Sequence, residues 1–330
     1  MIKVAMLSKW HVHAEGYANE VNRSGKAQVA AVWDEDKNRG AEWAGRLGVD
    51  FVECLDELLA REDIDAVIVD TPTTAHRDVI IKAAKAGKHV FTEKALCPTV
   101  AECEDVKKAI LDAGVTFTIS YPMRGTPTVQ FAKKMIESGA FGKLSLVRIR
   151  NGHNGVSGNW LPAYWFEKKD AAGGAMMDLG CHPMYTLPYL CGKPKRINGI
   201  FTAPFGSKVD ENAVSTIEFE GGIIGIGETS FITYATKEMI EIYGSEGTLI
   251  SINGEVQFKS SKTDAYGADW FKPRLPQPKP STINRFLDAI IAGEKAPEGL
   301  GIDDAIALTE LLENAYIADE TNRYQLRIEA

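Results

Sequence analysis

The segment 65–98 constrains the fold most, because it reads as a strand, a helix and a second strand followed by a polar loop. Ala66–Val69 is a short apolar run with β-branched residues, which is typical of a strand buried on both faces of a parallel sheet. Pro72 ends it, and apolar residues at helical spacing then continue to Gly87. His89–Thr92 is predicted to lie parallel to the first strand, since a crossover helix joins the two.

Lys94 follows the second of these strands almost directly. Ligands of open parallel sheets bind at the carboxyl ends of the strands, so we expect Lys94 to face a ligand crevice. The plain alternative is a solvated lysine in a turn.

The chain begins with another strand–helix–strand unit, predicted over 2–7, 14–21 and 28–33. A dinucleotide-binding turn between such a strand and helix usually carries three glycines, which allow a tight turn and a close approach of the phosphates. Here Ser8, Trp10 and His13 take those positions. The helix N-terminus, with unsatisfied amides expected from about His11 to Ala14, can still bind phosphate. The cofactor contacts predicted in this turn are Ser8, Trp10, His11 and Val12.

Asp34 ends the second strand of this unit. An acidic residue there accepts hydrogen bonds from the adenosine ribose hydroxyls and repels a 2′-phosphate, so we expect NAD rather than NADP. The alternative is a turn or helix-capping aspartate.

The two loops of the segment 65–98 resemble a known family. Thr71, Pro72 and His76, paired with Glu93 and Lys94, are similar to the signature of the glucose–fructose oxidoreductase / inositol dehydrogenase / rhizopine catabolism (Gfo/Idh/MocA) family of NAD(P)-dependent oxidoreductases. That family usually shows Glu-Lys-Pro, whereas this chain has Ala95 third. The resemblance implies that Thr71, Pro72, His76 and Glu93 contribute to the cofactor site.

A second signature follows the pair Gly173 and Gly174. In a continuous helix Asp178 and His182 would share one face, close enough for the carboxylate to influence the imidazole. From the residues alone, a capping or core histidine is the plain interpretation. The resemblance implies instead that Lys94, Asp178 and His182 form the catalytic set at the nicotinamide ring.

A loop predicted over 150–174 is rich in asparagine, glycine and aromatic residues. Long loops in compact domains are usually functional, so we expect a substrate lid. The aromatic residues could also only anchor the loop to the core. The predicted substrate contacts are Tyr121, Arg124, His153, Trp160, Tyr164 and Trp165.

The length of 330 residues predicts two domains. We expect an α/β protein: residues 1–120 as an N-terminal Rossmann domain with a doubly wound parallel sheet, and 121–330 as a C-terminal α+β domain with a mostly antiparallel open sheet. An exposed sheet face carrying Ile224, Ile226, Ile240 and Ile242 predicts a homodimer or homotetramer, as the resemblance also implies.

Composition narrows the class of function. A net charge of −8 argues against a nucleic acid partner. The sequence shows no apolar run near the ~20 residues of a membrane span and no secretory leader, so we expect a cytoplasmic protein without a membrane partner. The five cysteines show no Cys-x-x-Cys spacing, and no metal cofactor is predicted.

Together these features predict an NAD-dependent enzyme, with NADP less favoured, that moves a hydride between nicotinamide and a secondary alcohol or ketone of a sugar, glycoside or inositol-like polyol. Two alternatives stay open. A nucleotide-binding sensor of the same fold would explain the missing glycines, but it has no need of an acid–base set. A metal-dependent hydrolase could use His11 and His13, although the other histidines fit that fold badly.

Overall fold

The structure is a computed structural model that describes residues 1–330 except 236–237, 263–268, 322–324 and 327–330. The chain divides into two compact units: unit 1 holds residues 1–121 and 280–309, and unit 2 holds 122–279 and 310–330. The stretch 280–309, predicted to lie in the second domain, therefore belongs to the first unit. Each unit is described by itself.

Unit 1 is built on a six-stranded parallel sheet in the order β3-β2-β1-β4-β5-β6. The order runs outward on both sides from β1 and β4, which confirms the doubly wound Rossmann arrangement. The strands are β1 (Ile2–Leu7), β2 (Ala27–Trp33), β3 (Asp50–Phe51), β4 (Ala66–Val69), β5 (His89–Thr92) and β6 (Phe117–Ile119).

The helices that follow these strands begin and end where the sequence indicates. Asp36 caps α2, and Thr99 forms a capping box with Glu102 at the start of α5. Gly48 and Gly114 end the two helices in the left-handed conformation. The helices are α1 (Ala14–Arg23), α2 (Lys37–Leu47), α3 (Leu55–Leu59), α4 (His76–Lys85) and α5 (Val100–Ala113).

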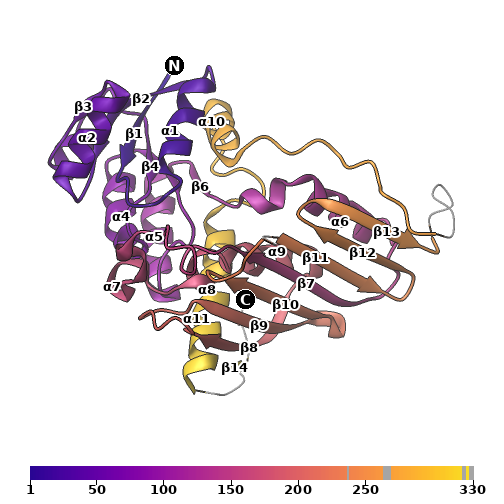
Figure 1. Ribbon diagram of the computed structural model, residues 1–330. Coiled ribbons are helices and arrows are strands. Elements are labelled where there is room, and N and C mark those ends of the chain that lie inside the picture. The colour runs from indigo at the N-terminus through magenta and orange to yellow at the C-terminus, as the bar shows by residue number, and fades with distance from the viewer. Residues whose placement is uncertain (236–237, 263–268, 322–324, 327–330) are drawn as a thin grey trace. The chain divides into compact units, whose positions relative to one another are not determined.

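Helix α10 (Thr282–Ala292) returns to unit 1 and lies beside α1, as Figure 1 shows. Phe286 packs on Phe91 of β5 with ring centroids 5.7 Å apart, in the same buried cluster as Ile283 and Leu287. The backbone N–H of Phe117 on β6 donates to the carbonyl of Lys295. The return of 280–309 thus completes the core and the outer edge of the sheet.

Unit 2 contains an eight-stranded sheet in the order β13-β12-β11-β7-β10-β9-β8-β14. Neighbouring strands are antiparallel except β7 and β10, so the predicted mostly antiparallel sheet is confirmed. The strands are β7 (Leu144–Gly152), β8 (Pro194–Thr202), β9 (Asn212–Phe219), β10 (Ile224–Ser230), β11 (Glu238–Gly244), β12 (Gly247–Ile252), β13 (Glu255–Ser260) and β14 (Gln325–Leu326).

Helix α9 (Cys181–Cys191) packs on β7 and β10 and covers one face of this sheet. A Cβ at Gly225 would lie 2.6 Å from Phe219 and 3.3 Å from Leu187 of α9, so glycine permits this close packing. The other helices are α6 (Pro127–Glu137), α7 (Lys168–Ala171), α8 (Ala175–Asp178) and α11 (Ile302–Thr321), of which α11 begins in unit 1 and ends in unit 2.

The opposite face of this sheet, called the open face here, carries Ile224 and Ile226 of β10, which alternate with the covered Gly225. Ile240 and Ile242 are fully buried, so their predicted exposure was wrong. Side chains alternate along a strand, and on β11 the isoleucines take the covered face while Glu241 takes the open one. Among the described residues, no helix is long and apolar enough to cross a membrane.

Candidate active site

The turn between β1 and α1 keeps the backbone path of a dinucleotide-binding turn without its glycines. Ser8 has a φ of 78°, the left-handed region that glycine usually supplies. Its hydroxyl accepts from the Trp10 amide at 3.0 Å and donates to Glu35 at 3.0 Å, which holds the residue in this conformation. Trp10 is buried, so its ring is turned into the protein, whereas Val12 is exposed.

The amides at the start of α1 are engaged, although we expected them to be unsatisfied. The N–H of His11 donates to the carbonyl of Asp70 at 3.1 Å, and the N–H of His13 approaches Nδ1 of His11 at 3.2 Å. The N–H of Ala14 donates to the carbonyl of His11. These contacts fix the turn against β4, so phosphates bound here would have to replace some of them.

Asp34 lies at the end of β2, as predicted, but its carboxylate is already paired. Arg39 donates to it in a bidentate manner, with Nη2–Oδ1 at 2.6 Å and Nε–Oδ2 at 3.0 Å. The amides of Lys9 and Asp36 donate to the same carboxylate at 2.8 Å each. Asp34 therefore orders both the phosphate turn and Arg39, a guanidinium that the sequence reasoning had overlooked.

The loop after β4 is fixed by His76, which was predicted to contact the cofactor. Its Nε2 lies 3.0 Å from the carbonyl of Thr71, and its Nδ1 lies 3.0 Å from the carbonyls of Ala95 and Leu96. Burial lowers the pKa of His76 to about 4. His76 thus links the loop after β4 to the loop after β5 through buried hydrogen bonds. Pro72 of the first loop is also buried.

The hydroxyl of Thr71 is buried and has no hydrogen-bond partner among the described residues. Buried polar atoms are normally paired, so an unpaired hydroxyl at the carboxyl end of a central strand is consistent with a ligand site.

Glu93 and Lys94 follow β5 and are both buried. The carboxylate of Glu93 accepts from the Lys94 amide at 2.9 Å, lies 2.8 Å from Nδ1 of His13 and accepts from the hydroxyl of Tyr17. Burial acts to raise the pKa of Glu93, but His11, His13 and Lys94 together hold it well below its ordinary range. The ammonium of Lys94 lies 3.9 Å from the same carboxylate, so this lysine is held at the strand end and is not a solvated turn residue.

In unit 2 the second signature folds as two helices and not as the one continuous helix considered from the sequence. Helix α8 ends at Asp178 and α9 begins at Cys181, with Gly180 packed against the backbone of Met176 between them. A Cβ at Gly180 would lie 2.6 Å from the carbonyl oxygen of Met176, which explains the glycine at this position. Leu179 and Gly180, which lie between the two helices, keep helical backbone angles.

His182 lies in the first turn of α9 and is buried, with Nδ1 2.8 Å from the hydroxyl of Tyr185. Arg124 donates to the carbonyl of Tyr185 at 2.9 Å and lies over the rings of Tyr185 and Tyr189. Arg124 therefore helps to hold α9 in place, and its predicted contact with the substrate stays a prediction.

Asp210 holds the turn that precedes α8. It accepts from the amides of Gly174 and Met176 at 2.9 Å and 2.7 Å and from the hydroxyl of Tyr316 at 2.8 Å. The backbone of Asp210 lies so close to Gly174 that no Cβ would fit there, which explains the glycine. No sequence signal near Asp210 indicated this role, because its partners lie 34 to 106 positions away along the chain.

The remaining predicted substrate residues fall into two groups. Tyr121 and Trp165 are buried, and Tyr121 of unit 1 donates to the carbonyl of Asp304, so both act as anchors. Trp160 is 51% exposed, and its ring lies 4.6 Å from that of His153, which stacks on Phe231. Tyr164 is half-buried in a short 3₁₀ turn. The segment 150–174 is thus partly ordered by β7 and α7, and only its exposed part fits the predicted lid.

A doubly wound parallel sheet with an ordered Glu-Lys segment at one strand end defines a nucleotide-binding α/β protein. Residues 11–121 match the family described as "Oxidoreductase family, NAD-binding Rossmann fold", and residues 129–250 match the GFO/IDH/MocA C-terminal domain. The chain belongs to this family. The predicted family and the predicted NAD-binding oxidoreductase are thereby confirmed.

Several characterised proteins are similar over most of the chain. The 1,5-anhydro-D-fructose reductase of Ensifer adhaerens is 27% identical over 84% of this chain and 83% of its own length. The inositol 2-dehydrogenase of Rhizobium meliloti (strain 1021) is 27% identical over 89% of this chain and 91% of its own length. A solved structure of levoglucosan dehydrogenase in complex with NADH superposes with a TM-score of 0.86 over 100% of both chains at 20% identity, which shows the common fold.

Proposed function

We propose that the substrate is a sugar, a glycoside or a cyclic polyol. The enzyme would remove a hydride from one carbinol carbon of this substrate, or add a hydride to the carbonyl carbon of the matching ketone. The similarity to an anhydrosugar reductase and an inositol dehydrogenase supports this substrate class. The observation that carries the proposal is Lys94, held beside Glu93 at the carboxyl end of β5 in a Rossmann sheet. A cytoplasmic location belongs to the proposal, since turnover needs the NAD pool of the cell interior.

The cofactor fits unit 1 in two respects: Ser8 preserves the glycine-like turn, and Thr71 offers an unpaired hydroxyl at the end of β4. Ser8, His11, Val12 and Thr71 would hold NAD, and bound NAD would supply the hydride acceptor or donor. Pro72 and His76 would shape the loop around it.

Oxidation of a secondary alcohol also requires a base for the hydroxyl proton. We assign this role to His182, whose Nδ1 is oriented by Tyr185 so that Nε2 would take the proton. Asp178 would stabilise the imidazolium that forms. Lys94 would donate to the substrate oxygen as negative charge develops on it.

A substrate screen tests this function directly. The purified chain with NAD⁺ should form NADH, read at 340 nm, with at least one compound among inositols, aldoses, anhydrosugars and methyl glycosides, and with NADH it should reduce the matching ketone. A chain that binds NADH but turns over no member of the panel would favour the nucleotide-binding sensor instead.

Cofactor preference gives a second test. We predict at least tenfold tighter binding of NADH than of NADPH, a difference of ~1.4 kcal/mol, measured by calorimetric titration. Asp34→Asn should reduce this preference, because it removes the charge that opposes a 2′-phosphate and releases Arg39 to bind one. Asp36→Asn is the control, since asparagine still caps α2. Equal affinities of the parent protein for NADH and NADPH would show that Asp34 does not bind the adenosine ribose.

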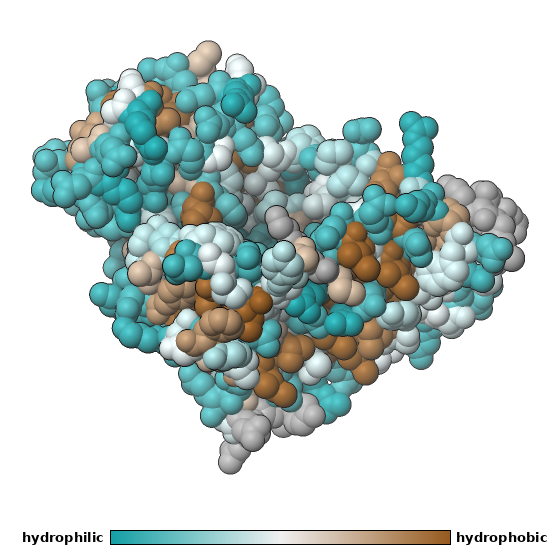
Figure 2. Space-filling view, in the orientation of Figure 1, coloured by the Kyte–Doolittle hydropathy of each residue, from teal (hydrophilic) through white to brown (hydrophobic). Residues whose placement is uncertain are grey.

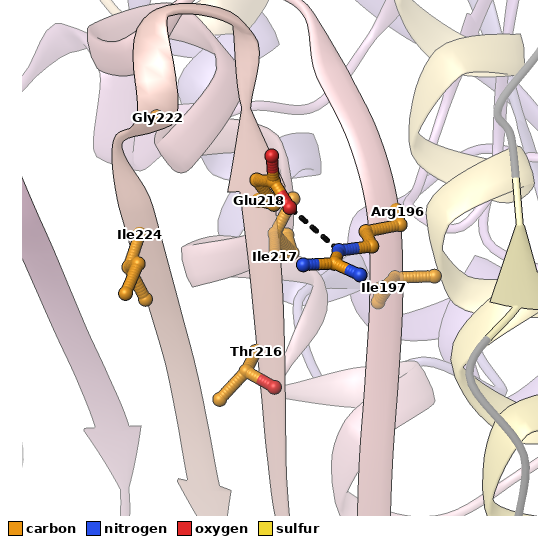
Figure 3. A pocket seen from close by; sticks show the side chains of 7 residues that line it. All are labelled: Arg196, Ile197, Thr216, Ile217, Glu218, Gly222 and Ile224. Carbon is orange, nitrogen blue, oxygen red and sulfur yellow. Dashed lines mark ion pairs between the residues drawn. The ribbon is translucent and has the colours of Figure 1, made fainter.

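The open face supports the proposed homo-oligomer. Figure 2 shows apolar side chains gathered over the strands of unit 2. Three isoleucines of these strands, Ile200, Ile224 and Ile252, are at least 45% exposed. Beside Ile224 lies a depression of about 590 Å³, drawn in Figure 3, where Arg196 pairs with Glu218. Exposed apolar groups of this kind usually mark an interface, and an isologous contact would bury them symmetrically.

We therefore predict a dimer or tetramer at micromolar concentration by light scattering. Ile224→Asp should lower the mass to that of a monomer, because it would bury an unpaired charge in the interface. Leu111→Asp, on the exposed surface of α5, should leave the mass unchanged. A monomeric parent protein would contradict the proposal.

A further inference from the structure

His11, His13 and Glu93 of unit 1 form a cluster of possible metal ligands beside the proposed NAD site, which also includes His11. None of the three side chains takes or gives the proton or the hydride in the proposed reaction. One candidate donor atom from each of the three residues lies within 4.8 Å of the others. Nδ1 of His13 is 2.8 Å and Nδ1 of His11 is 3.9 Å from the same oxygen of Glu93. Metal–ligand bonds of about 2.0 to 2.2 Å place two donors on one ion roughly 3 to 3.5 Å apart. The two spacings to Glu93 lie close to this range, and the cluster as a whole, within 4.8 Å, would have to contract around the ion.

The cluster is built into the protein and is not an accident of its surface. The side chains of Glu93 and His11 are 1% and 5% exposed, while His13 is 44% exposed and gives access from solvent. Glu93 is oriented by the Lys94 amide and by Tyr17, whose hydroxyl lies 2.7 Å from that of Ser120. Such outer contacts hold ligands in place at metal centres.

Asp70 is a second, independent observation. It lies at the end of β4, next to His11 through the hydrogen bond from the His11 amide to its carbonyl. Its side chain is fully buried, and neither carboxylate oxygen has a hydrogen-bond partner among the described residues. A buried unpaired carboxylate is costly unless it is neutralised.

We propose that His11, His13 and Glu93 bind one divalent transition-metal ion of the zinc class, with Asp70 as the neighbouring charge that the ion compensates. Two imidazoles and one carboxylate favour zinc, cobalt or nickel over magnesium or calcium, which prefer oxygen ligands. The ion would displace the 3.2 Å contact between the His13 amide and His11. In return the ion would link the turn before α1 to the end of β5. This turn is the one that lacks the glycines of a usual dinucleotide-binding turn.

The test uses the full chain without any nucleotide, so its outcome is independent of the proposed dehydrogenase activity. After dialysis against a chelator, the protein should bind one equivalent of Zn²⁺ with a Kd of about 10 μM or tighter in calorimetric titration. Co²⁺ should give the visible absorption bands of a protein site with nitrogen and oxygen ligands. One equivalent of Zn²⁺ should also raise the melting temperature, since a ligand of the folded state stabilises it.

His13→Ala is the main variant because His13 is partly exposed and its loss should not prevent folding. It and Glu93→Gln should weaken Zn²⁺ binding at least tenfold. Cys54→Ser controls for an exposed thiol, and His153→Ala controls for a histidine of unit 2, and both should bind Zn²⁺ like the parent. Binding of less than about 0.1 equivalent at 100 μM Zn²⁺, or unchanged affinity in His13→Ala, would overturn the proposal.

Discussion

Replacing Lys94 with alanine is expected to lower turnover at least about a hundredfold while the affinity for NADH changes little. An ammonium that donates to an oxygen on which charge develops acts mainly in the transition state, and such a contribution is typically worth a few kcal/mol. Lys94 is 3% exposed and is fixed between the end of β5 and the carboxylate of Glu93, so little reorganisation would be needed during the reaction. Steady-state kinetics on the substrate found by screening, with calorimetric titration of NADH, measures both quantities.

Lys88 provides a matched control at the opposite end of the same strand. It is also a buried lysine, and its ammonium donates to the carbonyls of Arg61 and Ile64 at 2.7 Å and 2.8 Å. Lys88→Ala should reduce stability, because two buried carbonyls lose their partner, and leave turnover within about threefold. Equal losses of turnover in the two variants would mean that Lys94 acts only through stability.

His182→Ala should reproduce the kinetic loss of Lys94→Ala if the imidazole takes the hydroxyl proton. Near-normal turnover would place the base elsewhere. Tyr121 and His153, both predicted to contact the substrate, are the other candidates for the base. The hydroxyl of buried Tyr121 donates to the carbonyl of Asp304, so His153 is the residue to test next.

The sequence was sufficient for the element order because its local signals agree with the fold. Gly48 and Gly114 end helices, Thr99 and Glu102 form a capping box, and short β-branched runs form the buried strands of unit 1. Each of these features is decided by residues within a few positions of one another, so neighbouring sequence contains the information.

The site was less predictable because its geometry depends on distant partners. His76 has a structural role because the loop after β5, about 20 residues further along the chain, places two carbonyl groups next to its ring. Asp34 is paired with Arg39, and Gly180 is a glycine because the backbone of Met176 packs closely against it. The face of β11 that Ile240 and Ile242 occupy was likewise set by the pairing register, and a shift of one residue would have exposed them.

The domain assignment of 280–309 failed for the same reason, and Phe286 offers a direct test of the observed arrangement. Helix α10 is amphipathic in sequence, but nothing in its pattern says which core it completes. In the structure Phe286 is fully buried against Phe91 of β5. Phe286→Ala should lower the free energy of unfolding of unit 1 by about 3 to 5 kcal/mol, the usual cost of removing a buried phenylalanine ring. Chemical denaturation measures this loss.

Ile291→Ala is the control, since Ile291 lies on the same helix and is 64% exposed, so its truncation should change stability by less than about 0.5 kcal/mol. Hydrogen exchange then locates the effect of Phe286→Ala. If α10 completes the core of unit 1, the amides of β5 and α1 should exchange faster in this variant, while those of β9 and β10 keep the protection of the parent protein. Faster exchange confined to β9 and β10 would instead assign α10 to unit 2, in agreement with the predicted domain range 121–330.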